Sequence, residues 1–192
     1  IAGQIIRAAQ LVTVYLVPTI ELVEQTAKEL EDQLPGTLIA LHYGETKELT
    51  AHGVIVMTYH ILERYWNAGA LPEDIRRAAL IVADEAHRSM TAARMKALEE
   101  AFDSRAVRLG LTASPDWNEH RQLAHFFPDL IHRMTIPEAV DLGLLAKPKI
   151  FVHDVDVDGS EITLLPGGDF DDEELGRLMS SGPFLEWARR CR

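Results

Sequence analysis

The sequence predicts an α/β fold in which crossover helices join the strands of a parallel β-sheet. Through the first 150 residues, short apolar segments alternate with longer segments of helical periodicity, which is the pattern of successive βαβ units. One segment, Ala79–Ala83 (ALIVA), is apolar without interruption, as expected of a strand buried on both faces of a parallel sheet. Ligands bind at the carboxyl ends of strands in such sheets, so the residues that carry chemistry are expected there.

The chain is expected to open with a helix, a strand and a second helix. Ile1–Gln10 has the apolar spacing of the later part of an amphipathic helix. Val12–Val17 (VTVYLV) is strand-like and is followed by a proline. Thr19–Leu34 places its apolar residues at helical spacing, and Pro35-Gly36 ends that helix.

Four more strands and a helix complete the expected sheet. The strands are expected at Leu38–Tyr43, Val54–Met57, Ala79–Ala83 and Val107–Leu111. Ser89–Phe102 is expected to be helical because its apolar residues recur on one stripe. Beyond the sheet, Ile150–Val157 has the alternation of a strand. Asp169–Met179 is expected to be a short helix, with acidic residues at its N-terminal end where the helix dipole favours them.

Composition excludes several classes of protein. Hydrophobic residues make up 47% of the 192 residues, enough to bury a core. A single cysteine, Cys191, excludes an internal disulfide framework and a cysteine zinc cluster. No apolar run approaches the roughly 20 residues that span a bilayer, and no basic-then-apolar leader opens the chain. We therefore expect a soluble cytoplasmic protein with no membrane partner, associated with the nucleoid if its source is bacterial.

The net charge is acidic and unevenly distributed. Its formal value of −11 argues against a simple electrostatic nucleic-acid binder. Residues 151–192 carry 4 basic and 10 acidic side chains, which is more than half of the net negative charge. The first 150 residues are closer to neutral, so the acidic total weighs less against nucleic acid than it first suggests.

The motif that carries chemistry is Asp84-Glu85-Ala86-His87, directly after the apolar run. Two adjacent carboxylates at the end of a buried strand repel each other and lose hydration, and a cation relieves that cost. Mg²⁺ suits such a site because it prefers carboxylate oxygen and keeps several waters. The first acid can hold the metal, and the second can polarise an attacking water in phosphoryl transfer. The alternative is that both acids cap the helix that follows.

This tetrapeptide after an apolar strand resembles the Walker B motif of superfamily 2 DEAH-type helicases and translocases. Three other segments are similar to motifs Ia, Ib and III of that family, in the same order: Val17–Gln25, Val54–Leu62 and Leu109–Pro115, with Ser114 in place of the usual threonine. The resemblance covers about residues 1–150 and implies a RecA-like first motor domain. It is strongest to the branch that contains type I and III restriction motor subunits and DNA-repair helicases.

The resemblance also implies a domain organisation. Thr135–Lys147 is similar to the segment by which the family's chain leaves the first motor domain. We therefore expect residues 1–149 to form motor domain 1, and residues 150–192 to form a linker and the start of a second domain.

Each functional residue of the tetrapeptide has a role implied by the resemblance. Asp84 would bind the Mg²⁺ of Mg-ATP, and Glu85 would orient or activate the hydrolytic water. His87 would couple the nucleotide site to motif III and to the second motor domain. The alternative for His87 is a histidine packed at a strand end.

Motif III implies a relay of nucleotide state. Thr112 and Ser114, on either side of Ala113, would carry that relay through their hydroxyl hydrogen bonds. The alternative is an ordinary Ser/Thr-Pro turn.

Motifs Ia and Ib imply nucleic-acid contacts, with DNA favoured over RNA because of the branch resembled. Pro18 and Thr19 would touch a phosphate at a helix start, where backbone N–H groups and the helix dipole favour an anion. The alternative there is a plain N-cap threonine. Thr58 and Tyr59 would touch the same nucleic-acid strand further along, with a buried strand-end tyrosine as the alternative.

Two parts of the family's catalytic machinery have no counterpart in the sequence. No Gly-Lys dipeptide occurs, so the phosphate loop G-x-x-x-x-G-K-[ST] is missing, and we expect it a few residues upstream of Ile1. The Q-x-x-G-R-x-x-R motif that supplies arginine fingers is also missing, and in the family it lies in the second motor domain. Without the loop and the fingers, we expect this chain alone not to hydrolyse ATP.

The sequence thus predicts part of an ATP-dependent DNA helicase or translocase, which couples Mg-ATP hydrolysis to movement on nucleic acid. The alternative is a degenerate RecA-like module that binds nucleic acid or a partner protein without ATP turnover. A nuclease-type Mg²⁺ site at Asp84 and Glu85 is a weaker third hypothesis, because the sequence places no third carboxylate or lysine beside them.

Overall fold

The computed structural model describes residues 2–89, 91–113, 123, 127–149, 162–163 and 171–180. The chain forms two compact units, Ile1–Arg133 and Met134–Arg192, and each is described by itself. The domain boundary expected after residue 149 falls inside the second unit and stays a prediction. No helix among the described residues is long and apolar enough to cross a membrane.

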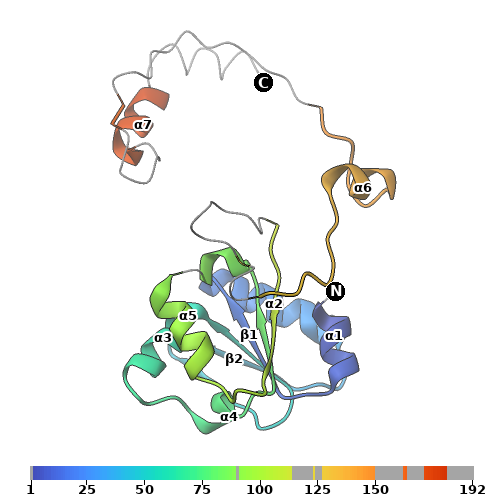
Figure 1. Ribbon diagram of the computed structural model, residues 1–192, viewed down its shortest axis with the longest axis vertical. Coiled ribbons are helices and arrows are strands. Elements are labelled where there is room, and N and C mark those ends of the chain that lie inside the picture. The colour runs from blue at the N-terminus through green and yellow to red at the C-terminus, as the bar shows by residue number, and fades with distance from the viewer. Residues whose placement is uncertain are drawn as a thin grey trace. The chain divides into compact units, whose positions relative to one another are not determined.

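The first unit is built on one six-stranded sheet with the strand order β3-β2-β4-β1-β5-β6. Figure 1 shows this sheet with helices on either side of it. Its strands are β1 (Thr13–Val17), β2 (Ile39–Tyr43), β3 (Thr46–Lys47), β4 (Val54–Thr58), β5 (Leu80–Ala83) and β6 (Val107–Gly110). Every neighbouring pair is parallel except β2 and β3, which form an antiparallel hairpin. The predicted α/β class is therefore confirmed, and the sheet is parallel as expected except for this hairpin.

Helices cover both faces of the sheet. They are α1 (Ala2–Ala9), α2 (Ile20–Gln33), α3 (Tyr59–Asn67), α4 (Glu73–Arg76) and α5 (Ala92–Glu100), with a 3₁₀ turn, η1, at Ala86–Ser89. Apolar side chains of α1 and α2 pack on one face, and those of α3, α4 and α5 pack on the other. The chain places β2 and β4 on one side of β1, and β5 and β6 on the other. This reversal makes the carboxyl end of β1 a topological switch point.

The central strands are buried throughout, which explains their apolar sequences. Every residue of β1, β4 and β5 is buried. Along β1, Val14 and Leu16 belong to the core under α3 to α5, whereas Tyr15 and Val17 belong to the core under α1 and α2. This alternation follows from the two-residue period of a strand. It gives a hydrophobic layer on each side of the sheet.

One strand and two α-helices of the first unit have no counterpart among the elements expected from the sequence. The hairpin strand β3 has only two residues and follows a turn in which Gly44 has a φ of 46°. Helix α3 begins directly where β4 ends, and no Gly or Pro marks the boundary between them. Thr58 is both the last residue of β4 and the N-cap of α3. Helix α4 has a single turn, too short to show a period.

The second unit contains two short described helices. Helix α6 (Ile136–Asp141) starts with a capping box, in which Thr135 and Glu138 satisfy each other's backbone N–H groups. Helix α7 (Asp172–Met179) is capped by Asp171 and carries three acidic residues in its first turn, close to the span expected from the sequence. The strand expected at Ile150–Val157 lies outside the described residues.

Gly53, which precedes β4, provides a test of this packing. Its φ is 113°, a conformation that L side chains rarely adopt, and a Cβ there would clash with the carbonyl oxygen of Leu38. We expect Gly53→Ala to lower the free energy of unfolding by about 3 kcal/mol, from backbone strain and overpacking together. Urea denaturation measures this change.

Gly36 is the matched control, because its φ is also positive at 84° but a Cβ there would meet open space. Gly36→Ala should therefore cost only about 1 kcal/mol of backbone strain. Equal losses for the two variants would contradict the packing described around Gly53.

Candidate functional site

The residues singled out by the sequence lie at the carboxyl edge of the sheet. Thr19 follows β1, Thr58 ends β4, Asp84 follows β5 and Thr112 follows β6. These four strands are neighbours in the sheet, and their carboxyl ends share one edge because they are parallel. The topology therefore gathers all of the described candidate segments along the carboxyl edge of the sheet, on both sides of the switch point.

Asp84 is held at the tip of β5 by its backbone and side chain. Its N–H donates to the Leu16 carbonyl at 2.9 Å, which extends the ladder with β1. Its Oδ1 accepts the N–H of Glu85 at 2.9 Å. Partial burial raises the pKa of the Asp84 carboxyl, and the neighbouring Glu85 charge adds to this, whereas the Glu85 N–H and the Tyr15 hydroxyl act in the opposite direction. The carboxylate thus carries the desolvation and repulsion that the sequence analysis anticipated.

Glu85 has an unusual backbone conformation. Its φ is 47°, in the left-handed region, which non-glycine residues rarely occupy. The residue sits between β5 and η1, so the chain turns sharply here. Its side chain is 43% exposed and therefore reaches solvent beside the half-buried Asp84. Left-handed residues that are not glycine cluster at functional sites because the surrounding structure must enforce them.

His87 connects the tetrapeptide to the segment after β6. Its Nδ1 lies 2.9 Å from Oγ1 of Thr112 and 3.3 Å from Oε2 of Glu85. The Ala86 N–H donates to the carbonyl of Leu111 at 2.8 Å. Side-chain and backbone bonds therefore tie the tetrapeptide to the start of the motif III segment.

The remaining motif III residues differ in what the structure shows. Ala113 is exposed at the end of the described segment. Ser114 lies outside the described residues.

Two helix starts stand beside these carboxylates at the same edge. Thr19 is exposed and caps α2, with its Oγ1 accepting the Leu22 N–H at 3.4 Å. Pro18, just before it, is half-buried. Thr58 caps α3 in the same way, accepting the Ile61 N–H at 3.4 Å, but it is only 5% exposed. Thr19 is therefore the more accessible of the two caps.

Tyr59 lies in the core. It is 1% exposed, and its hydroxyl donates to the carbonyl oxygen of Asp84 at 2.7 Å. Its side chain therefore does not face the surface, where a nucleic acid would contact it. The geometry of Tyr59 matches the alternative to a nucleic-acid contact, which is a buried tyrosine at a strand end.

Tyr15 is a site residue that the sequence analysis missed. It lies on β1 and pairs with Val82 of β5. Because side chains alternate along a strand, the direction of Val82 recurs at Asp84, on the same face of the sheet as Tyr15. The Tyr15 hydroxyl acts to lower the pKa of the Asp84 carboxyl, against the effect of burial. Burial and the Asp84 charge raise the pKa of Tyr15 itself. A phenol in the middle of a buried strand was the available signal.

The donor set fits Mg²⁺ brought in by a nucleotide better than a resident metal. Among the described residues, no group of three or more His, Cys, Asp or Glu side chains could hold a metal ion. Mg²⁺ needs only one or two carboxylates when phosphate oxygens and waters complete its shell. Asp84 offers one such carboxylate, and a cation beside it would offset the burial and repulsion that raise its pKa.

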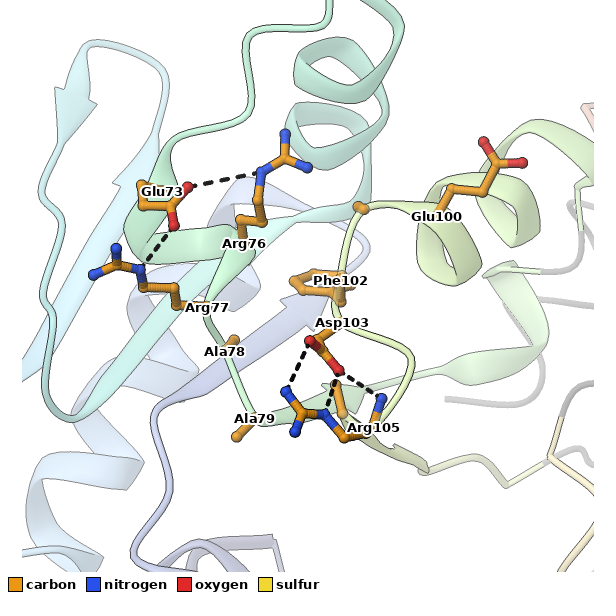
Figure 2. Close-up of a pocket in the computed structure, with 11 residues that line it drawn as sticks. Glu73, Arg76, Arg77, Ala78, Ala79, Glu100, Phe102, Asp103 and Arg105 are labelled. Carbon is orange, nitrogen blue, oxygen red and sulfur yellow. Dashed lines mark hydrogen bonds and ion pairs between the residues drawn. The ribbon is translucent and has the colours of Figure 1, made fainter.

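A cavity of about 610 Å³ lies at the opposite edge of the sheet, where β5 and β6 begin (Figure 2). Most of its charged side chains pair with one another: Glu73 contacts Arg76 at 3.9 Å and Arg77 at 2.7 Å, and Asp103 contacts Arg105 at 3.1 Å. The cavity is remote from the carboxylates at the tip of β5. It therefore belongs to the scaffold that carries the site and not to the site itself.

The fold and the edge geometry define the class of protein. A mostly parallel sheet with helices on both faces, and with the tetrapeptide Asp84–His87 directly after β5, has the arrangement of a RecA-like α/β domain. The chain belongs to the family described as type III restriction enzyme, res subunit, whose model matches residues 1–117.

Individual relatives agree with this assignment. The chain is 36% identical over 81 residues to the type I restriction enzyme EcoAI endonuclease subunit of Escherichia coli. The match covers 41% of this chain and 10% of that protein, so the chain spans about a tenth of the length of this curated relative.

Two solved helicase structures share the fold. The Pyrococcus furiosus Hef helicase domain has a TM-score of 0.51 at 24% identity, over 68% of this chain and 31% of that one. A hypothetical ATP-dependent RNA helicase from Sulfolobus tokodaii has a TM-score of 0.50 at 17% identity, over 67% of this chain and 41% of that one. At these identities the likeness concerns the fold alone.

The raised pKa of Asp84 predicts a gain in stability when its charge is removed. A carboxyl whose pKa is higher in the folded state costs stability as the pH rises from its ordinary value, about 4, through the raised value, and the cost persists above it. Asp84→Asn removes the charge but keeps an oxygen that can accept the Glu85 N–H. We expect a higher free energy of unfolding than wild type at pH 7, and a difference that shrinks toward pH 4, by urea denaturation in metal-free buffer.

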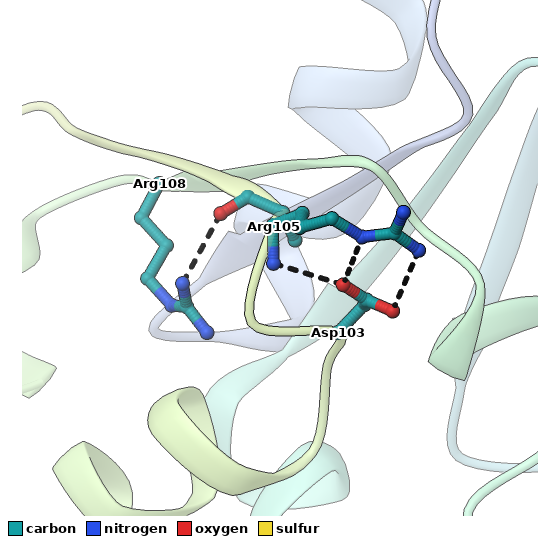
Figure 3. Close-up of polar contacts among 4 residues, drawn as sticks. Asp103, Arg105 and Arg108 are labelled. Atoms are coloured by element: carbon teal, nitrogen blue, oxygen red, sulfur yellow. Dashed lines mark hydrogen bonds and ion pairs between the residues drawn. The ribbon is translucent and has the colours of Figure 1, made fainter.

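Asp103 is the control with the opposite sign. Hydrogen bonds from Arg105 lower the pKa of Asp103 (Figure 3). The stabilisation is therefore present above the ordinary pKa and is lost as the pH falls. Asp103→Asn should slightly lower stability at pH 7, by little because the pair is exposed. The cause given for the Asp84 shift is wrong if Asp84→Asn also lowers stability at pH 7.

Proposed function

We propose that this chain is the body of the first motor domain of an ATP-dependent DNA helicase or translocase. The observation that carries the proposal is the contact of His87 with both Thr112 and Glu85 at the carboxyl edge. One histidine nitrogen thereby touches the carboxylate assigned to ATP hydrolysis and the segment assigned to coupling. Membership of the restriction-subunit family supports the same conclusion.

The two carboxylates have separate tasks in this proposal. Asp84 holds the Mg²⁺ of Mg-ATP, and the metal neutralises charge on the phosphates when it is bound. Glu85 accepts a hydrogen bond from the attacking water and orients it toward the γ-phosphate. The exposure of the Glu85 carboxylate, next to the half-buried Asp84, supports this division of labour.

His87, Thr112, Ala113 and Ser114 form the coupling path in this proposal. A change at Glu85 on loss of the γ-phosphate alters the contacts of His87, and His87 passes the change to the segment after β6. That segment transmits it to the second motor domain. Because His87 bonds Thr112 directly, the first step requires no intermediate residue.

The helix starts at Thr19 and Thr58, with Pro18, form the nucleic-acid contact in this proposal. Free backbone N–H groups at a helix start bind phosphate without a lysine, which is compatible with an acidic chain. The side chains of Thr58 and Tyr59 are both buried, so in this proposal nucleic acid meets the start of α3 through its backbone and not through either side chain. DNA is favoured over RNA because the family and the curated relative are restriction subunits. The name of the Sulfolobus tokodaii structure makes RNA the comparison to test.

The proposal requires parts that this sequence does not contain. A phosphate loop would hold the β- and γ-phosphates, and arginines of a second motor domain would neutralise charge in the transition state. The chain by itself therefore does not turn over ATP in this proposal. The intact protein acts in the cytoplasm, with nucleic acid, ATP and its own second motor domain as partners.

The experiment that tests the function is ATP hydrolysis by the intact protein with single-stranded DNA, duplex DNA and RNA in separate reactions at low salt. DNA should stimulate hydrolysis more than RNA does. Stimulation by none of the three would support the alternative, a RecA-like module that binds nucleic acid or a partner without turnover. Cleavage of DNA without ATP would instead support the nuclease hypothesis.

Glu85→Gln provides the matching mutational prediction. The amide keeps the size of the side chain but cannot take a proton from water, so we expect kcat to fall by about 10²- to 10⁴-fold. Affinity for Mg-ATP should change little, because Asp84 is untouched. Glu73→Gln, at the opposite edge of the sheet, is the control and should keep kcat near wild type. An unchanged kcat in Glu85→Gln would rule out the role proposed for this residue.

A further inference from the structure

The carbonyl group of Asp84 occupies a place where the sheet cannot provide a hydrogen bond. The ladder between β1 and β5 pairs Leu16 with Ala83, and the Asp84 N–H donates to the Leu16 carbonyl at 2.9 Å. The next bond of a parallel ladder would run from the N–H of residue 18 to the Asp84 carbonyl. Residue 18 is a proline and has no N–H. The carbonyl therefore needs a donor from outside the ladder.

Tyr59 supplies that donor. Its hydroxyl donates to the Asp84 carbonyl oxygen at 2.7 Å, a short and well-formed bond. The ring is 1% exposed, so water does not compete freely for either group. Burial and the nearby Asp84 charge raise the pKa of Tyr59, which keeps its proton in place for donation.

This bond fixes the peptide group between the two carboxylates assigned to ATP hydrolysis. The Asp84 carbonyl belongs to the peptide that joins Asp84 to Glu85, and Glu85 has the left-handed φ of 47°. The Glu85 N–H at the other end of the same peptide donates to Oδ1 of Asp84. One peptide plane is thus held through both its oxygen and its hydrogen. A rotation of this plane would change the φ of Glu85 and break the bond that holds Oδ1 of Asp84.

The donor comes from the helix whose start is assigned to nucleic acid. Tyr59 is the first residue of α3, directly after the N-cap Thr58. A movement of this helix start therefore shifts the hydroxyl that holds the Asp84–Glu85 peptide. Pro18, Tyr59 and Asp84 come from three different motifs and meet at this one carbonyl.

We propose that Tyr59 is a positioning residue, which sets the Asp84–Glu85 peptide through its hydroxyl and transmits the nucleic-acid state of α3 to the ATP-hydrolysing carboxylates. This inference rests on the function proposed above. It deepens that function by naming a second connection, separate from the path through His87 and Thr112. Tyr59 touches neither ATP nor nucleic acid in this role.

Tyr59→Phe in the intact protein tests the inference, because it removes only the hydroxyl. We expect kcat at saturating nucleic acid to fall by about tenfold, since small misplacements of catalytic groups have effects of this size or larger. The KM for ATP and the Kd for nucleic acid should stay within about twofold, because no binding group is removed. A surface contact of Tyr59 with nucleic acid would instead change the Kd.

Tyr65→Phe is the matched control. Tyr65 lies on the same helix, and its hydroxyl is 2.9 Å from Nε2 of His42, away from the Asp84 carbonyl. This variant loses the same atom from a polar pair in the same core. Its thermal stability should fall as in Tyr59→Phe, and its kcat should stay near wild type. Equal kcat values for the two variants would overturn the inference and would leave a purely structural role for Tyr59.

Hydrogen–deuterium exchange gives a second readout that does not depend on turnover. In Tyr59→Phe, the amides of residues 84–87 should exchange faster than in wild type, whereas Tyr65→Phe should leave them unchanged. Unchanged exchange in Tyr59→Phe would overturn the inference even if kcat fell. An intact wild-type protein with no nucleic-acid-stimulated hydrolysis would remove the proposed function and this inference together, which distinguishes that failure from the failure of the inference alone.

Discussion

The burial of β1, β4 and β5 on both faces is the constraint on which the arrangement of the site depends. A strand covered by helices on each side has no face on which a charged side chain could stay hydrated. Side chains that are charged at neutral pH therefore appear only beyond the ends of these three strands. Because the strands run parallel, their carboxyl ends coincide, and residues far apart in the sequence, such as Thr19, Asp84 and Thr112, become neighbours along one edge.

Much of the fold could be predicted because this constraint is written directly in the sequence. A strand buried on both sides must be apolar at nearly every position, and Ala79–Ala83 met that condition; the structure has β5 there. The start of α3 could not be predicted in the same way, because no turn separates it from β4 and Thr58 belongs to both elements. Periodicity alone does not place the boundary between two elements that are joined without a turn.

The position of the Asp84–His87 tetrapeptide at a strand end could be predicted from the sequence. The contacts around it that depend on tertiary packing could not. Asp84, Glu85 and His87 follow one another in the chain, so their proximity was assured. The positions of the Tyr15 and Tyr59 hydroxyls around Asp84 depend on strand register and on the packing of α3 beneath the sheet. A single sequence records neither of these. For Tyr59 the same ring could equally have faced a nucleic acid, and only its burial distinguishes the two.

The left-handed backbone of Glu85 has a consequence for engineering. Glycine adopts such a conformation without steric cost, so substitution by glycine at this position relieves strain in addition to removing a charge beside Asp84. A laboratory selection for heat resistance alone would therefore enrich changes at the residue assigned to water activation. Libraries built to stabilise this protein should therefore keep Glu85 fixed. Under the role proposed for Glu85, a substitution that raises thermal stability there would also abolish ATP hydrolysis.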